Sequence, residues 1–128
     1  MRVAGCGICH SLTAKGPRRE NDSLYLAGSD AAFEHPALGK VWARNLTADV
    51  ETGLGRYDAA AIHQAMRDGR RLDGKKMAPP MSGLVPHYSG LSETDLDAMV
   101  AYLKTVPAAK HRVPERQLVE PLRSVLGG

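Results

Sequence analysis

The sequence has few aromatic residues, few cysteines and no long apolar run, and each shortage excludes a class of protein. Aromatic residues make up 5% of the 128 positions, although 43% of the residues are hydrophobic. A core built from small aliphatic side chains would be thin unless a large, flat group filled it. With two cysteines the chain has no disulfide framework. No run approaches the roughly 18 consecutive apolar residues that a membrane-spanning helix needs, so the sequence predicts no such helix.

The charge is mildly basic, with 17 Lys and Arg, 14 Asp and Glu and a formal net charge of +3. A nucleic-acid-binding domain normally shows a denser basic stripe with interleaved aromatic residues, so nucleic acid is not an expected partner. The densest basic run is broken by two aspartates and consists of Arg67, Arg70, Arg71, Lys75 and Lys76. We interpret this run either as a solvated surface or as a docking face for an acidic redox partner.

Helical periodicity occurs in two places. Apolar residues recur at helical spacing in 58–69, and again in 92–107, where a serine three residues ahead of an aspartate resembles a capping box. Glycine and proline make 72–91 a predicted loop. Residues 11–54 are irregular, and so long a loop is uncommon in a compact domain unless it wraps around a ligand. The tail after Pro107 is expected to be extended, with one short helical turn.

Both cysteines belong to one short motif, Cys6-Gly7-Ile8-Cys9-His10. This C-x-x-C-H spacing is typical of haem attachment, because two thiols can reach the two vinyl groups of one haem while the adjacent imidazole meets the iron. A zinc site and a redox dithiol are the alternatives. Zinc would need a fourth ligand from a distant histidine, and the candidates are His35, His63, His87 and His111. A dithiol would normally follow a strand and open a helix, a pattern that is almost absent here.

A second iron ligand must come from far along the chain, and methionine and histidine are the candidates. Met66 and Met99 occupy apolar helix positions, which favours a place in the core. Met77 and Met81 fall in the predicted loop, and two prolines stiffen the backbone just before Met81. We therefore predict Met81 as the ligand, with Met77, a histidine or an open position as alternatives.

Four segments together resemble the class I c-type cytochromes, and within them the cytochrome subunits of bacterial membrane-bound alcohol and gluconate dehydrogenases. In chain order they are Cys6 to His10; Asn45-Leu46-Thr47-Ala48-Asp49 with Thr52-Gly53-Leu54-Gly55; Pro79-Pro80-Met81; and Leu91-Ser92 with Asp95-Leu96 and Ala101-Tyr102-Leu103. The stretch Tyr25-Leu26-Ala27-Gly28 is also similar to the family. The resemblance runs from about Val3 to Pro107.

The resemblance implies a small all-α domain, 1–107, whose helices and long loops wrap around one covalently attached haem c. Residues 108–128 lie outside the resemblance and are expected to form a C-terminal extension that packs on the domain or trails from it. It implies His10 and Met81 as axial ligands and periplasmic transfer of single electrons. The expected partners are redox proteins such as a dehydrogenase subunit or a terminal oxidase.

Three further residues are candidate haem contacts through the same resemblance. Asn45 and Thr47 are expected on the loop that wraps the haem edge, although an ordinary turn explains the same residues equally well. Trp42 is expected against the porphyrin or its propionates, with a plain core position as the alternative.

A rival interpretation is a haem enzyme or gas sensor with an open sixth coordination position and His63 or His87 as its polar distal group. The beginning of the chain raises a separate expectation. Related domains start with a helix of two to three turns before the first cysteine, whereas five residues, Met1 to Gly5, precede it here, and no signal peptide is visible. We therefore expect Met1 to be an internal residue of a longer, exported or membrane-anchored precursor.

Overall fold

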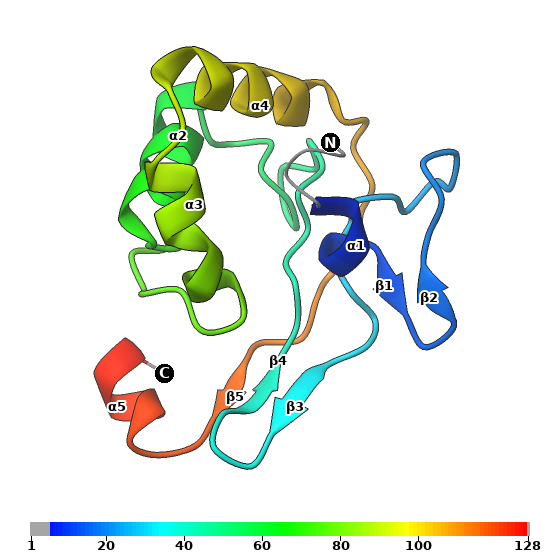
Figure 1. Ribbon diagram of the computed structural model, residues 1–128. Helices are drawn as coiled ribbons and strands as arrows, with labels where there is room; N and C mark the ends of the chain where they lie inside the picture. Colours follow the sequence, from blue (N-terminus) through cyan, green and yellow to red (C-terminus); the bar gives the residue numbers. More distant parts are fainter. Residues whose placement is uncertain (1–5, 128) are drawn as a thin grey trace. The chain divides into compact units, whose positions relative to one another are not determined.

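The computed structural model describes residues 6–127 (Figure 1). The expectation about Met1 and a longer precursor therefore lies outside the described residues. The chain forms two compact units, each assembled from stretches that are distant in sequence. The described part of the first unit comprises 6–32, 42–56 and 101–115, and that of the second comprises 33–41, 57–100 and 116–127.

The first unit is mostly loop around a short N-terminal helix. Helix α1 (Cys6–His10) is followed by a hairpin of β1 (Leu12–Thr13) and β2 (Gly16–Pro17), which pair antiparallel (Figure 1). Its buried apolar residues come from two stretches that are distant in sequence: Leu26, Ala27, Leu103, Val106, Ala109 and Val113. Such a core holds loops together through long-range contacts, which explains why no helical or strand period is visible in most of this unit.

The second unit contains the two helices that the sequence predicts. Helix α2 (Ala59–Asp68) begins where the Asp58 carboxylate accepts a hydrogen bond from the backbone N–H of Ala61 at 2.8 Å. Helix α4 (Glu93–Thr105) begins after Ser92, whose hydroxyl accepts from the N–H of Asp95 at 3.1 Å, and residues after Val100 belong to the first unit. Both predictions, 58–69 and 92–107, are confirmed within a residue or two.

The prediction of a plain loop over 72–91 is wrong in its second half. A 3₁₀ turn, η1 (Met81–Leu84), leads directly into helix α3 (Val85–Ser89), which contacts α2 (Figure 1). Pro86 lies in the first turn of α3, where its missing N–H has no intrahelical partner to lose and its fixed φ suits a helix. Proline therefore starts this helix rather than preventing it.

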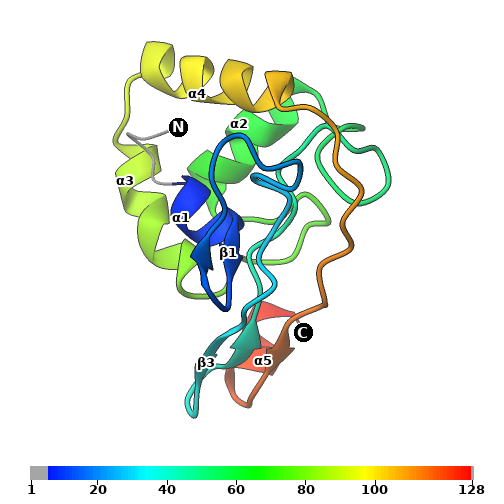
Figure 2. The same ribbon diagram turned by 90° about the vertical axis from the view of Figure 1, so that its right-hand side faces the viewer.

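The all-α expectation is confirmed only in part, because short strands accompany the helices. In the second unit, β3 (Phe33–His35), β4 (Gly39–Val41) and β5 (Gln117–Leu118) form an antiparallel sheet in that order. Gly39 has φ +99°, and a Cβ there would collide with the carbonyl oxygen of Gln117, so the turn and the pairing both require glycine. Helix α5 (Leu122–Leu126) follows β5 (Figure 2), in agreement with an extended tail that contains one helical turn.

The longest described helix is α4, with 13 residues. Within residues 6–127, no helix is both long enough and apolar enough to cross a lipid bilayer.

Candidate functional site

Helix α1 presents the two cysteines on one face, because residues three apart in a helix are neighbours on its surface. Both thiols are free and half-buried. Burial raises the pKa of the Cys6 thiol, which keeps it protonated, whereas a redox dithiol works through a thiolate of lowered pKa. The side chain of Ile8 between them is 64% exposed. The helix therefore places two free thiols on one face, next to a solvent-exposed side chain. The raised pKa of Cys6 weakens the interpretation as a redox dithiol.

The imidazole of His10 is oriented by the backbone of a distant loop. Its Nδ1 lies 2.7 Å from the carbonyl oxygen of Arg44, and because that oxygen can only accept, Nδ1 donates and Nε2 keeps its lone pair. Burial lowers the pKa of His10, and the nearby Arg44 charge acts in the same direction, so the neutral ring is favoured. A neutral imidazole whose second nitrogen donates to a carbonyl is the usual form of a metal-ligating histidine, so these residues fit an iron-bound haem.

The end of α1 is fastened by the segment that follows the hairpin. The N–H of Gly28 donates to the carbonyl of His10 at 2.8 Å, and the fully buried Ser11 hydroxyl accepts from the N–H of Leu26 at 2.7 Å. A Cβ at Gly7 would collide with the ring and hydroxyl of Tyr25. Sequence reasoning missed Ser11, although its position next to His10 and the similarity of the Tyr25 to Gly28 stretch were signals.

Asn45 and Thr47 are both buried and brace the first unit. The Asn45 Oδ1 accepts from the Thr47 N–H at 2.8 Å and from the Thr47 hydroxyl at 2.7 Å, which is an Asx turn. The Asn45 amide nitrogen lies 2.9 Å from the carbonyl of Ala109, and the Thr47 hydroxyl accepts from the Ala109 N–H at 3.1 Å. Their polar atoms are therefore engaged with protein, which supports a structural role, and direct haem contact by either residue stays a prediction.

Thr52 is the centre of this network and was not identified from the sequence. Its hydroxyl donates to the Asp49 carboxylate at 2.6 Å and accepts from the Asn45 amide at 3.0 Å and the His111 N–H at 3.1 Å. Hydrogen bonds from the Thr52 hydroxyl and N–H hold the pKa of Asp49 below its usual range. Three residues from two distant segments thus bond to one hydroxyl, and these hydrogen bonds fix the loop that follows Arg44.

The other predicted haem residues lie as follows. Trp42 belongs to the first unit and is half-buried. Met81 belongs to the second unit, is half-buried and begins η1. Met77 is held differently, because its N–H donates to the carbonyl of Gly69 at 2.8 Å and it lines a surface hollow with neighbours that include Leu126. Met66 is buried, as predicted for the core, while Met99 is half-buried.

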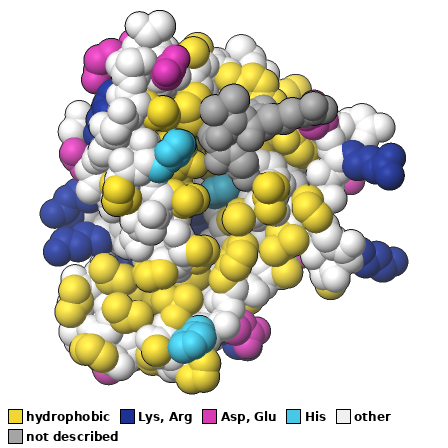
Figure 3. All heavy atoms as spheres, in the orientation of Figure 1, with side chains coloured by type: hydrophobic (Ala, Val, Ile, Leu, Met, Phe, Trp, Pro, Cys, Tyr) yellow, Lys and Arg dark blue, Asp and Glu magenta, His cyan; other side chains and the backbone are white. Residues whose placement is uncertain are grey.

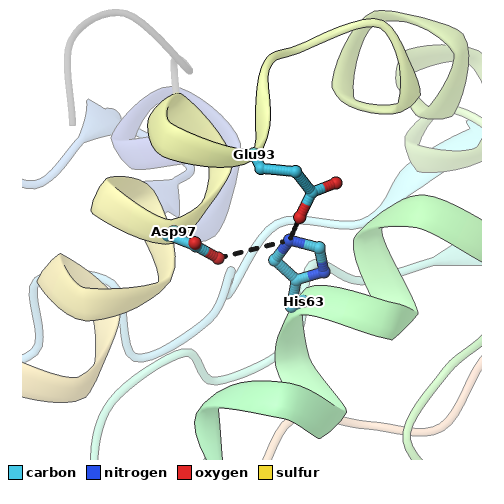
Figure 4. Close-up of side chains that lie close together, drawn as sticks. All are labelled: His63, Glu93 and Asp97. Atoms are coloured by element: carbon cyan, nitrogen blue, oxygen red, sulfur yellow. Dashed lines mark ion pairs between the residues drawn. The ribbon is translucent and has the colours of Figure 1, made fainter.

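The histidines proposed as a fourth zinc ligand have other surroundings. In the first unit, His111 places Nδ1 2.7 Å from the carbonyl of Ala27 and Nε2 3.0 Å from the Asp30 carboxylate, so both ring nitrogens already face acceptors. In the second unit, His63 faces carboxylates of α4 (Figure 4). His87 is exposed and packs edge-on against Tyr88. These arrangements weaken the zinc interpretation for Cys6 to His10, and they weaken His63 as a free distal group.

The basic run is not one solvated surface. The Arg67 guanidinium donates to the carbonyl of Ser89 at the end of α3 and to that of Leu91 just after it, the latter at 3.0 Å, and it pairs with Glu93 at 2.7 Å. Arg71 pairs with Asp73 at 2.9 Å. Arg67 therefore holds the second unit together, and a docking role for the run stays a prediction.

Residues 2–107 match the family model for cytochrome c. The chain is 29% identical over 116 residues to one of the nicotinate dehydrogenase subunits of Pseudomonas putida, in an alignment that covers 91% of this chain and 9% of that protein. It is 35% identical over 101 residues to the cytochrome c subunit of a quinone alcohol dehydrogenase of Gluconacetobacter polyoxogenes, in an alignment that covers 79% of this chain and 19% of that protein. The gluconate 2-dehydrogenase cytochrome c subunit of Pantoea cypripedii is 34% identical over 110 residues, in an alignment that covers 80% of this chain and 23% of that protein.

The chain thus spans less than a quarter of each of these relatives. The family match covers most of the chain and includes the two thiols on α1 and the oriented imidazole of His10. The protein belongs to the cytochrome c family: it is an electron-transfer domain with covalently bound haem c.

Proposed function

We propose that this domain carries one haem and passes single electrons from a dehydrogenase subunit to a membrane-bound or soluble redox partner on the periplasmic side. The observation that carries the proposal is the hydrogen bond from His10 Nδ1 to the carbonyl of Arg44, because it presents Nε2 as a ligand beside Cys6 and Cys9. The single C-x-x-C-H motif supports one haem per chain.

The chain's own residues divide the work of holding the haem. Cys6 and Cys9 would attach it through thioether bonds, and His10 would bind the iron through Nε2. Met81 would also bind the iron, through a soft thioether that would stabilise ferrous iron and keep other ligands away. When bound, the haem supplies a one-electron ferric and ferrous couple. The Asn45, Thr47 and Thr52 network would keep the surrounding loop rigid, so that little reorganisation accompanies electron transfer.

A dehydrogenase is the proposed partner because the relatives are named as subunits of nicotinate, alcohol and gluconate dehydrogenases. The surface offers apolar side chains for such a contact. In the second unit Leu84, Val119 and Val125 are exposed, and Figure 3 shows apolar side chains (yellow) gathered where α5 and the loop before α3 lie. We also propose that the chain divides into a cytochrome domain, 1–107, and a C-terminal extension, 108–128.

Potentiometric titration of the purified haem-loaded protein tests the one-electron role. The ratio of oxidised to reduced haem should follow a single Nernst curve, changing tenfold for about 59 mV as expected for one electron. Mixing the reduced domain with an oxidised c-type cytochrome should then transfer the electron without oxygen or an organic substrate. A protein that instead turns over a substrate on its own, or whose haem binds oxygen when reduced, would be an enzyme or a sensor.

A further inference from the structure

A cluster outside the haem residues combines one histidine with two carboxylates. His63 projects from α2, and Glu93 and Asp97 lie four residues apart on α4, so that both carboxylates share one face of that helix (Figure 4). One ligand atom from each side chain can be chosen so that all three lie within 4.8 Å of one another. All three residues belong to the second unit.

The imidazole nitrogen at the centre of this cluster is buried and unsatisfied. Nε2 of His63 is 3.1 Å from Glu93 Oε2 and 3.3 Å from Asp97 Oδ1, yet neither oxygen is aligned for a hydrogen bond and the nitrogen is shielded from solvent. Figure 4 shows the ring pointing between the two carboxylates. A buried polar atom without a hydrogen bond is unfavourable, and a cation bound between this nitrogen and the two anionic oxygens would remove that penalty.

The spacing suits a metal ion. Zinc binds imidazole nitrogen and carboxylate oxygen at about 2.0–2.2 Å with tetrahedral geometry, which puts neighbouring ligand atoms about 3.3–3.5 Å apart. The two distances from Nε2 are close to this value before any adjustment. A set of one nitrogen and two oxygens also favours zinc or a similar divalent transition metal over calcium or magnesium, which prefer oxygen alone.

Arg67 has two opposite effects on this cluster: it orients Glu93, and its positive charge weakens cation binding. Its guanidinium pairs with the other oxygen of Glu93, Oε1, at 2.7 Å, and it also bonds the carbonyl of Leu91 at 3.0 Å. These bonds orient Glu93 so that Oε2 faces His63, as an outer hydrogen-bond partner orients a metal ligand. Its positive charge weakens cation binding, but with two carboxylates the cluster keeps a net negative charge when His63 is neutral.

We propose that His63, Glu93 and Asp97 form a binding site for a divalent transition-metal ion of the zinc type, which clips α2 to α4. Three protein ligands leave room for water as the fourth. The site is independent of Cys6, Cys9 and His10 and does not depend on the electron-transfer proposal, because it needs only the second unit to be folded.

Calorimetric titration of the haem-loaded protein with zinc chloride, in a buffer that does not bind zinc, tests the proposal. We expect one zinc per chain, an affinity at least tenfold weaker in both His63→Gln and Asp97→Asn, and an unchanged affinity in the control His35→Gln. His35 is an exposed histidine whose Nδ1 accepts a backbone N–H at 3.0 Å, so it matches His63 in residue type only.

Thermal unfolding provides a second reading that does not depend on calorimetry. Zinc should raise the unfolding temperature of the unsubstituted protein and leave that of His63→Gln unchanged, because only a ligand that binds the folded state stabilises it. The exposed Asp97 carboxylate can become an amide without disturbing the core, and an unchanged haem spectrum will show that this variant is folded. Failure of the unsubstituted protein to bind zinc, or equal affinity in His63→Gln and His35→Gln, would overturn the proposal and leave an ordinary ion pair.

Discussion

Nδ1 of His10 donates a hydrogen bond to the carbonyl oxygen of Arg44, 34 residues further along the chain, at 2.7 Å. This bond assigns the proton of the imidazole and leaves Nε2 for the iron. We therefore expect nitrogen-edited NMR spectra of the haem-loaded protein to show one exchange-protected His10 Nδ1–H proton. The variant Arg44→Ala should keep that proton, because the acceptor is a backbone carbonyl. A protonated Nε2 would contradict the assignment.

The Thr52 hydroxyl should contribute measurably to stability, because it bonds Asp49, Asn45 and the backbone of His111 at once. Thr52→Val keeps the shape of the side chain but leaves these partners unsatisfied, which costs about 1–3 kcal/mol. Urea unfolding of the haem-loaded protein measures the loss.

Thr105→Val is the matched control for Thr52→Val. Thr105 is exposed, and within residues 6–127 its hydroxyl donates to one carbonyl, that of Tyr102, at 2.6 Å. Its removal should change the free energy of unfolding by less than about 0.5 kcal/mol. Equal losses in the two variants would show that the shared hydroxyl has no special role.

Met81 should be the sulfur ligand of the iron. Met81→Ala is expected to abolish the sulfur-to-iron charge-transfer band of the ferric protein and to open the iron to added ligands. The reduction potential should fall by about a tenth of a volt or more, since axial ligand choice spans roughly 0.8 V among haem proteins. Met77→Ala should do little of this, because the N–H of Met77 is bonded to the carbonyl of Gly69 at the end of α2 and the residue lines a surface hollow together with Leu126. A band lost in Met77→Ala but kept in Met81→Ala would reverse the assignment.

Arg116 connects the C-terminal extension to the chain before Met77. The guanidinium, in a residue that is 9% exposed, donates to the carbonyls of Lys76 at 2.7 Å and Leu126 at 2.9 Å. Arg116→Met should lower the free energy of unfolding by about 1.5–3 kcal/mol, as loss of charged hydrogen-bond donors does. If the extension also steadies the Met81 loop, imidazole should bind the ferric haem more tightly in this variant.

Arg123→Met is the control for Arg116→Met. The Arg123 side chain is mostly exposed and pairs with Glu120 at 2.9 Å, and such pairs contribute at most about 1 kcal/mol. We expect little change in stability and none in imidazole binding. Destabilisation by Arg116→Met with unaltered imidazole binding would restrict Arg116 to a structural role.

Local signals explain what sequence reasoning could predict. Helices α2 and α4 have their start signals, Asp58 and Ser92, within three residues of the N–H groups that these side chains cap. The haem motif is equally local, because all of its residues lie on α1. Features whose physical cause lies within a few positions can be predicted from a single sequence.

Long-range pairing explains what could not be predicted. Strand β5 forms because Leu118 pairs with Gly39, and neither of these short strands has a visible period. The roles of Ser11 and Thr52 depend on loops that approach only in the folded chain. Helix α3 was hidden because proline indicates a loop in most contexts, whereas in a first helical turn it favours the helix.

The most direct test of the account is the covalent haem on Cys6 and Cys9. Acid–acetone treatment of the purified protein should leave the colour with the polypeptide, and intact-mass measurement should give the chain plus one haem. Replacing both cysteines by alanine should leave a chain without attached haem. Haem that is extracted from the unsubstituted protein, or a mass equal to the polypeptide alone after expression with a haem-attachment system, would contradict the account.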